Sequence, residues 1–396
     1  MAPDLRLVKS ATDREQAEYE KKIARHRFGI ALKVILAIAA FALFAVILAR
    51  QTHIRVYTTY NRISAETLSM TNGAKTLALK DKLLIYTNDG IRCVDAQGKD
   101  VWNQAYEMQA PMVHTCENMV AVGDYNGRRI YVLSGDGPLG TIDTNMPVTA
   151  ISVAGNGVVA ASLEEAGTTW IYLYDSKGTN LAYMKTTMKK SGYPIAFSLS
   201  PNGKLLQVSY FYADNGKMKS SVAFYNFGEV GQDKIDNYVS GYDYVDAVVP
   251  IVHFMDDSTA FAVADSRLMF YHGNQIPASA AEILLDREIQ SVYYSDRYVA
   301  LVYLNQTGET KYQMDIYDGD GQKKLTLDYD MECQDVLIDK DNVILHAKDQ
   351  FQIYSMDGKQ KFSGNYEKMI HLMFPQGGLY QYTIVTQNSI DVIQLK

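Results

Sequence analysis

The sequence predicts an all-β protein: an eight-bladed β-propeller preceded by one N-terminal transmembrane helix. An apolar strand running into a polar turn recurs eight times, at the period of a propeller blade, and one long apolar segment precedes the first repeat. The residue before each turn is aromatic or aliphatic, and these anchor positions are Val94, Leu133, Tyr174, Tyr225, Tyr271, Tyr317, Tyr354 and Ile393. Their spacings of 39, 41, 51, 46, 46, 37 and 39 residues fit four-stranded blades.

One repeat shows how four strands follow from the residues. Apolar runs at 148–153 and 158–163 are separated by the turn Gly155-Asn156-Gly157, and a third run at 170–174 ends in a second turn at 175–178. A fourth, outer strand begins at Thr179. By the same pattern, the first strands of the eight units begin near Ala74, Pro111, Pro147, Pro194, Val249, Glu288, Cys333 and Lys368.

The eighth unit stops at its third strand, so the ring needs a strand from elsewhere. Residues 54–70 can supply it, and that closure would remove the exposed edges of an open array. Seven blades are the alternative if the first or last unit is irregular.

The apolar segment is long enough to cross a membrane once. Residues 34–49 are sixteen consecutive apolar residues, and Lys33 lies near one end, where its stem can reach the interface. Lys21, Lys22, Arg25 and Arg27 precede it, which by the positive-inside rule keeps the N-terminus in the cytoplasm. The prediction is therefore a basic cytoplasmic tail (1–27), a transmembrane helix (28–50), a juxtamembrane segment with the closing strand (51–70) and an extracytoplasmic propeller (71–396). A cleaved signal peptide is the competing interpretation.

The tail itself has the pattern of a charged helix. Residues 10–27 begin with the N-cap candidates Ser10 and Thr12, and Glu18 and Lys22 are spaced for a helical ion pair. Such a helix could recruit a cytoplasmic partner or be a solvated extension of the membrane helix.

The charge and the cysteines exclude some classes of function. Residues 51–396 carry 29 basic and 40 acidic residues, a formal charge of about −11, which argues against a nucleic-acid partner. Cys93, Cys116 and Cys333 each fall in a strand pattern and show no zinc-binding spacing, so we expect them to be packed as small apolar residues.

Loop lengths point to one end of the ring as the binding surface. Connections at 188–193, 211–219 and 236–246 are long, whereas those at the other end are short. The long connections bring tyrosines with neighbouring aspartates, and tyrosine offers contact area with a polar tip. The predicted partner-binding residues are Tyr193, Tyr210, Tyr212, Tyr238, Tyr242, Asp243, Tyr244 and Asp246. Packing between blades is the alternative use of these tyrosines.

The other motifs do not indicate a catalytic, cofactor-binding or metal-binding site. Gly135, Gly137 and Gly140 spell the dinucleotide fingerprint, but strands flank them on both sides, which predicts a hairpin. The Asp-Gly pairs of residues 318–321 lack the glutamate that a calcium loop needs at its twelfth position. His114 and His253 occupy similar places in innermost strands and could face the channel. No catalytic motif is found, and we expect neither cofactor nor metal.

The segment Cys93–Trp102 resembles the repeat of the pyrroloquinoline-quinone-type eight-bladed propellers, with a strand, an aspartate, a Gly-Lys turn and a tryptophan. Weaker likenesses begin at Tyr174, Tyr317 and Tyr354. Where the family has its docking tryptophan, this chain has Trp102 once and elsewhere residues such as Leu181, Leu325 and Phe362. The vicinal cysteines and calcium-bound quinone pocket of those enzymes have no match, so the resemblance implies the fold and not the activity.

The whole organisation of tail, membrane helix and single propeller is similar to an uncharacterised group of envelope propellers of Gram-positive bacteria. The same fold in outer-membrane assembly machinery is a protein-binding scaffold, which the resemblance makes the expected role here. The alternatives are an enzyme, quinone-dependent or carbohydrate-active, and a ligand sensor that signals through a membrane partner.

Overall fold

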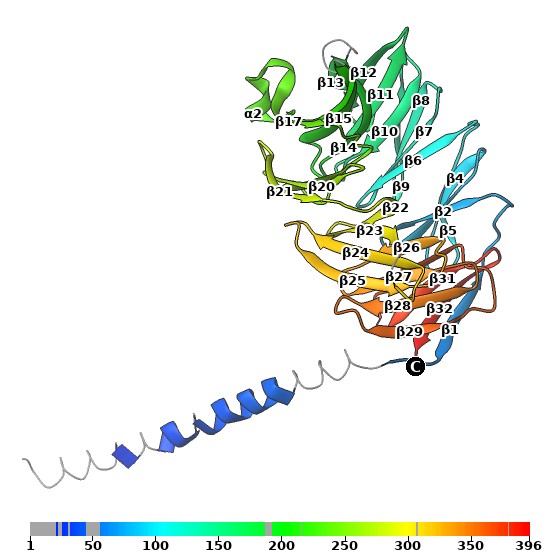
Figure 1. Cartoon of the computed structure of the whole chain (residues 1–396). Helices are drawn as coiled ribbons and strands as arrows, with labels where there is room; N and C mark the ends of the chain where they lie inside the picture. The colour runs from blue at the N-terminus through cyan, green and yellow to red at the C-terminus, as the bar shows by residue number, and fades with distance from the viewer. Residues whose placement is uncertain are drawn as a thin grey trace, which may run out of the picture. The chain divides into compact units, whose positions relative to one another are not determined.

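The propeller consists of eight four-stranded antiparallel sheets, shown in chain order from cyan to red in Figure 1. The computed structural model describes residues 21–22, 26–30, 32–44, 56–186, 192–214, 216–305, 308–378 and 380–396. The chain divides into two units, Met1–Val56 and Tyr57–Lys396, and the second unit contains all eight sheets. Eight blades are therefore confirmed, and the seven-bladed alternative is wrong.

Strands are lettered A to D in each blade, from the innermost to the outermost. Blade 1 consists of β2 (Lys75–Leu79), β3 (Lys82–Tyr86), β4 (Gly90–Val94) and β5 (Asp100–Ala105). Blade 2 consists of β6 (Pro111–Cys116), β7 (Met119–Asp124), β8 (Arg129–Ser134) and β9 (Gly137–Asp143). Blade 3 consists of β10 (Val148–Val153), β11 (Val159–Glu165), β12 (Thr168–Tyr174) and β13 (Asn180–Thr186). Blade 4 consists of β14 (Tyr193–Leu199), β15 (Leu205–Asp214), β16 (Lys217–Asn226) and β17 (Tyr238–Val245), with α2 (Glu229–Gln232) and a 3-10 turn η1 (Ile235–Asn237) before β17.

Blade 5 consists of β18 (Ile251–Phe254), β19 (Thr259–Val263), β20 (Arg267–His272) and β21 (Ala278–Leu284). Blade 6 consists of β22 (Ile289–Tyr294), β23 (Tyr298–Leu304), β24 (Tyr312–Asp318) and β25 (Lys323–Tyr329). Blade 7 consists of β26 (Asp335–Ile338), β27 (Asn342–His346), β28 (Gln350–Ser355) and β29 (Gln360–Asn365). Blade 8 consists of β30 (Leu372–Pro375), β31 (Gln381–Val385), β32 (Ser389–Leu395) and β1 (Tyr60–Thr67).

Blade 8 joins the two ends of the propeller unit. Its outer strand β1 pairs antiparallel with β32, with Tyr60 opposite Leu395 and Thr67 opposite Ser389. This closure is the one that the truncated eighth repeat predicts. Beyond the strand, the amide of Lys396 donates to the carbonyl of Thr59 at 2.8 Å, which extends the pairing.

The core is divided into eight apolar clusters, one between each pair of neighbouring blades, including blades 8 and 1. The B strands are the most buried: Val120, Ala121 and Val122 of β7 are 0% exposed. The A strands are less buried, and every residue of β6 is half-buried. The small apolar residues therefore lie in the strands that have packed neighbours on both sides.

All eight anchor residues are buried, and each lies at a β-bulge between the C and D strands. In blade 1, Cys93 pairs with Trp102 and Val94 with Asp100, so that Val101 is the extra residue. In blade 3 the extra residue is Leu181. The position equivalent to Trp102 is therefore Ala182, and the assignment of Leu181 to it was wrong by one residue because the bulge shifts the register.

The N-terminal unit contains one helix, His26–Phe44, that is apolar and long enough to cross a membrane. A signal sequence near an N-terminus would have the same length and composition. Most of the predicted tail helix at 10–27 lies outside the described residues.

Candidate functional site

The two ends of the ring carry different connections. The A–B and C–D turns lie at one end, which we call the turn face, and the B–C and D–A connections lie at the other, which we call the loop face. Blade 4 has the longest strands, since β15 and β16 have 10 residues each. Its β15–β16 hairpin contains residues 211–219, which the sequence analysis treated as a loop.

Tyr193 lies on the loop face, as predicted. Its hydroxyl donates to Oε2 of Glu164 at 3.1 Å, and the side chain is 37% exposed. Burial raises the pKa of Tyr193, and Glu164 and Tyr125 raise it further, so the hydroxyl stays protonated at neutral pH. The interaction with Tyr125, which is 50% exposed in the β7–β8 turn, brings blade 2 into the same surface.

The exposed surface continues into blade 4. A Cβ atom added at Gly192 would lie 3.2 Å from the Tyr212 ring, and Tyr212 is half-buried opposite Lys219. Val245 lies opposite Lys219 and Met218 lies opposite Ala213, and both are exposed. We call this set the tyrosine surface, and its residues are Tyr125, Glu164, Tyr193, Ile195, Tyr212, Met218 and Val245. Of these, only Tyr193 and Tyr212 were predicted from the sequence.

Tyr125 had a usable sequence signal. It stands in the turn Asp124-Tyr125-Asn126-Gly127, where an aromatic residue has no core to enter. Ile195 had no such signal, because its 36% exposure accompanies a bulge in β14 that only the structure reveals.

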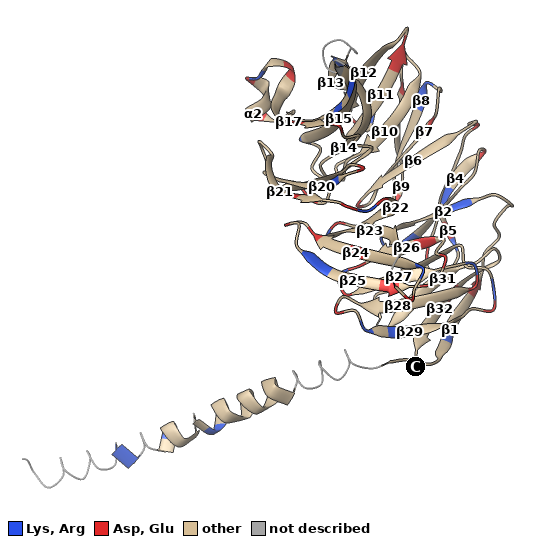
Figure 2. Ribbon diagram, in the orientation of Figure 1, with Lys and Arg blue, Asp and Glu red and all other residues tan. Residues whose placement is uncertain are grey.

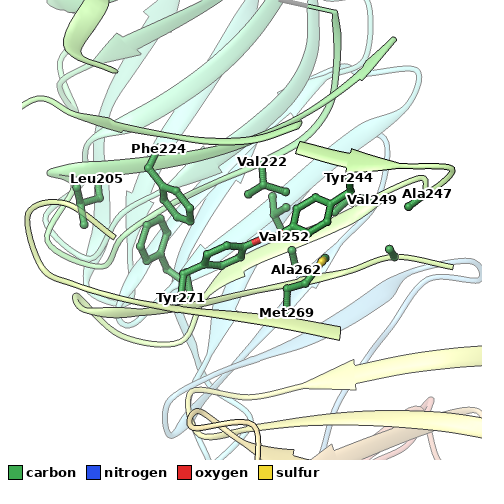
Figure 3. Close-up of a cluster of buried hydrophobic side chains, with 13 residues drawn as sticks. Leu205, Val222, Phe224, Tyr244, Ala247, Val249, Val252, Ala262, Met269 and Tyr271 are labelled. Carbon is green, nitrogen blue, oxygen red and sulfur yellow. Dashed lines mark hydrogen bonds between the residues drawn. The ribbon is translucent and has the colours of Figure 1, made fainter. Parts of the chain in front are cut away.

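Tyr210 and Tyr244 are buried, so the expectation that they are exposed is wrong. The hydroxyl of Tyr210 lies 2.9 Å from that of Tyr225, and the hydroxyl of Tyr244 lies 2.7 Å from that of Tyr271 (Figure 3). Burial raises the pKa of both tyrosines. Figure 3 shows the Tyr244 and Tyr271 rings inside the apolar cluster between blades 4 and 5.

Residues 238–245 form the outer strand β17, and the predicted loop at 236–246 is therefore wrong. The signal was the period-two spacing of Tyr238, Ser240, Tyr242 and Tyr244, which is typical of a strand. Tyr242 accepts a hydrogen bond from the Ser279 amide at 3.0 Å and donates to the Pro277 carbonyl at 3.2 Å, and these bonds tie blade 4 to blade 5.

The remaining predicted residues are exposed but do not form one patch. Tyr238 begins β17 at the turn face, so it lies at the other end of the ring from Tyr193. Asp243 is exposed in β17, and Asp246 pairs with Lys217 at 3.5 Å on the loop face. The long insertion of blade 4 at 227–237 also lies on the turn face, where only short links were expected.

A cavity of about 410 Å³ opens at the turn face end of the channel. His114 of β6 and His253 of β18 line it, which agrees with the prediction that both face the channel. The Val153 amide donates to Nδ1 of His114 at 3.1 Å. Burial lowers the pKa of His114 to about 4, and burial and His114 lower the pKa of His253 to about 3. Both imidazoles are neutral at pH 7, beside Glu117, Asp256, Asp257 and Asp296.

The described residues contain no group of three or more His, Cys, Asp or Glu side chains placed to hold a metal ion. The aspartates of the Asp-Gly loops bind backbone instead: Oδ1 of Asp318 accepts from the Gln322 amide at 2.8 Å. Burial raises the pKa of the Cys93 and Cys116 thiols to about 11 and that of Cys333 to about 12, which disfavours thiolate chemistry. Cys333 precedes β26 and is not in a strand, contrary to the prediction.

The ribbon in Figure 2 shows acidic and basic residues interspersed over the blades. Several form exposed ion pairs across a hairpin, such as Arg129 with Asp143 at 2.8 Å. This distribution offers a protein partner both signs of charge.

The solved structures that are similar to this chain share little sequence identity with it. BamB from Moraxella catarrhalis is 10% identical, with a TM-score of 0.49, and the match covers 85% of this chain and 100% of BamB. The computationally designed Ika8 protein is 11% identical with a TM-score of 0.48, covering 86% and 100%. A eukaryotic initiation factor is 11% identical with a TM-score of 0.45, covering 76% and 90%. These likenesses concern the fold alone.

No match was found among curated proteins. The family comparison, in contrast, extends over nearly the whole propeller unit. Residues 53–395 match the model of a family described as a family of unknown function, DUF5711, and the chain therefore belongs to that family.

Proposed function

We propose that this protein is a membrane-anchored docking module of the cell envelope, whose propeller binds a protein partner outside the cytoplasm. The partner binds the tyrosine surface on the loop face of blades 2 to 4. The observation that carries this proposal is the exposure of five aromatic and aliphatic side chains at the loop-face ends of blades 2 to 4, which are Tyr125, Tyr193, Ile195, Met218 and Val245.

The composition of the surface suits protein recognition. Tyr125 and Tyr193 provide large, stiff contact areas with hydroxyl groups that can bond to a partner. Ile195, Met218 and Val245 provide apolar area around them, and Glu164 is held beside Tyr193 by a hydrogen bond. Aromatic residues surrounded by apolar contacts are the usual composition of an interface hot spot.

The anchor and its orientation rest on the N-terminal unit. The helix His26–Phe44 is able to span a membrane; Lys21, Lys22 and Arg25 precede it in the sequence, and Arg27 is its second residue. By the positive-inside rule this arrangement leaves the tail in the cytoplasm and the propeller outside. Protease treatment of intact cells tests this topology. Degradation of the propeller, with a tag at residue 1 left intact, would support it.

Removal of the two tyrosines tests the docking site. Full-length Tyr125→Ala/Tyr193→Ala should recover its crosslinked partner from intact cells at least about tenfold less than wild type, because each hot-spot residue contributes about 2 kcal/mol or more. Crosslinking through a photoreactive residue at position 195, followed by mass spectrometry, identifies the partner and measures its yield.

Tyr238→Ala is the matched control, because Tyr238 is an exposed tyrosine (47%) on the turn face. It should leave the yield within about twofold of wild type. Equal yields for the double variant and wild type, or an equal loss in the control, would reject the site.

A further inference from the structure

Each blade ends in a D strand whose outer edge pairs with no other strand among the described residues. Such an edge presents free N–H and C=O groups and is a template for another strand unless charges, prolines or bulges protect it. Most D strands here have such protection: β9 contains Pro138 and two glycines, β25 contains Lys323, Lys324 and Asp328, and β1 contains Arg62 and Glu66.

Strand β13 of blade 3 is protected least. Among the described residues, it is the one D strand with two large apolar side chains that are more than half exposed, Leu181 at 54% and Tyr183 at 60%. Lys185 is its single charged residue. The bulge at Leu181 disturbs only its first residues, and Ala182–Thr186 pair regularly with β12.

An aromatic row adjoins this edge. The Tyr183 ring centre lies 5.3 Å from that of Tyr172 and 5.9 Å from that of Trp170. The Lys185 ammonium lies 5.1 Å from the centre of the Trp170 ring. Trp170, Tyr172, Tyr183 and Lys185 therefore share one face of the sheet, and that face is partly open to solvent.

We propose that β13 pairs antiparallel with β13 of a second copy of this chain, about a twofold axis at Met184. In this register Tyr183 of one copy lies opposite Lys185 of the other, and Ala182 lies opposite Thr186. The two blades then form one continuous eight-stranded sheet with the aromatic rows of both copies on one face. The two copies contact each other through the same surface, as in other twofold dimers.

The sequence of β13 favours a second copy as its partner strand. Every facing pair in this register is compatible, since no charge meets a like charge and each Lys185 ammonium meets the Tyr183 ring of the other copy. The bulged residues 180–181 lie outside the paired segment. The surface is distinct from the tyrosine surface, so this inference does not depend on the proposed docking function.

Cysteines placed at the facing positions test the pairing. Full-length Tyr183→Cys/Lys185→Cys, oxidised in native membranes, should run mostly as a disulfide-linked dimer of twice 44.4 kDa, because directly opposed residues have the Cβ separation that a disulfide needs. The native thiols contribute little background, since their pKa values are raised to about 11 or 12.

Glu282→Cys/Leu284→Cys in β21 is the matched control, with the same spacing on the outer strand of blade 5, and should give at least tenfold less dimer. The absence of dimer in the β13 variant, or an equal amount of dimer in the control, would overturn the proposal.

Sedimentation of the full chain in detergent measures dimerisation independently. Wild type should sediment as a dimer. Tyr183→Lys should sediment as a monomer, because it places the new lysine opposite Lys185 of the other copy. A monomeric wild type would also overturn the proposed pairing.

Discussion

Replacing Asp391 with alanine should destabilise the folded propeller by about 3 kcal/mol, because it leaves the groups around a buried carboxylate without their acceptor. Asp391 is 0% exposed in β32 of the closing blade. It accepts from the Tyr366 hydroxyl and from Nζ of Lys368 at 3.3 Å, and Nε of Arg62 lies 4.0 Å away. Burial and Asp391 raise the pKa of Tyr366, which keeps its hydroxyl a donor.

Urea unfolding of the full chain, followed by circular dichroism, measures this loss. Glu367→Ala is the control, because Glu367 pairs with the same Arg62 but is more than half exposed. It should cost less than about 1 kcal/mol. Similar losses for both variants would show that the buried carboxylate does not hold the closing blade together.

Replacing Asp315 with alanine should have a comparable effect, about 3–5 kcal/mol. Asp315 is 1% exposed in blade 6 and accepts from Arg287 at 2.7 Å, Lys323 at 2.9 Å and Thr326 at 2.7 Å. Arg287 also lies over the Tyr303 ring, with its guanidinium carbon 3.9 Å from the ring centre. Loss of the carboxylate would remove the acceptor shared by Arg287, Lys323 and Thr326 and leave a cavity at a buried position.

Asp143→Ala serves as the control for Asp315→Ala in the same unfolding measurement. Asp143 pairs with Arg129 at 2.8 Å, but both side chains are more than half exposed. The expected loss is below about 1 kcal/mol. A loss as large as that of Asp315→Ala would mean that burial does not set the strength of these pairs.

Asp315 and Asp391 occupy the same place in their repeats, two residues before the anchors Tyr317 and Ile393. Alternation along the C strand places this position on the same face as the buried anchor. A charged residue at this position therefore indicates a buried ion pair, and this could have been predicted from the sequence. The partner residues could not, because they come from other strands.

The repeat pattern sufficed for the fold because each blade is built from contacts close in sequence. Anchors such as Val94 and Tyr354 precede a tight turn in most repeats, and all eight anchors are buried at a bulge. The repeat pattern also predicted that the eighth repeat lacks its outer strand, and β1 supplies that strand.

The tyrosine surface could be predicted only in part. Tyr193 and Tyr212 lie on it, whereas Tyr210 and Tyr244 turn inwards to hydroxyl partners, Tyr225 and Tyr271, contributed by other strands. Tyr210 and Tyr212 are two residues apart in β15, so alternation places them on the same face and cannot separate the buried tyrosine from the more exposed one. The burial of Tyr210 and Tyr244 depends on the strands that contribute their hydroxyl partners. The error over 236–246 had another cause, since the period-two spacing of β17 was taken for a loop.

The two ends of the propeller unit meet in one blade and close a ring of eight. A disulfide between Asn61→Cys and Gln394→Cys tests this closure, since these residues lie opposite each other in β1 and β32. After proteolysis between blades, the N-terminal and C-terminal fragments should stay linked until the disulfide is reduced. Fragments that separate without reductant, although the chain was folded and oxidised, would contradict it.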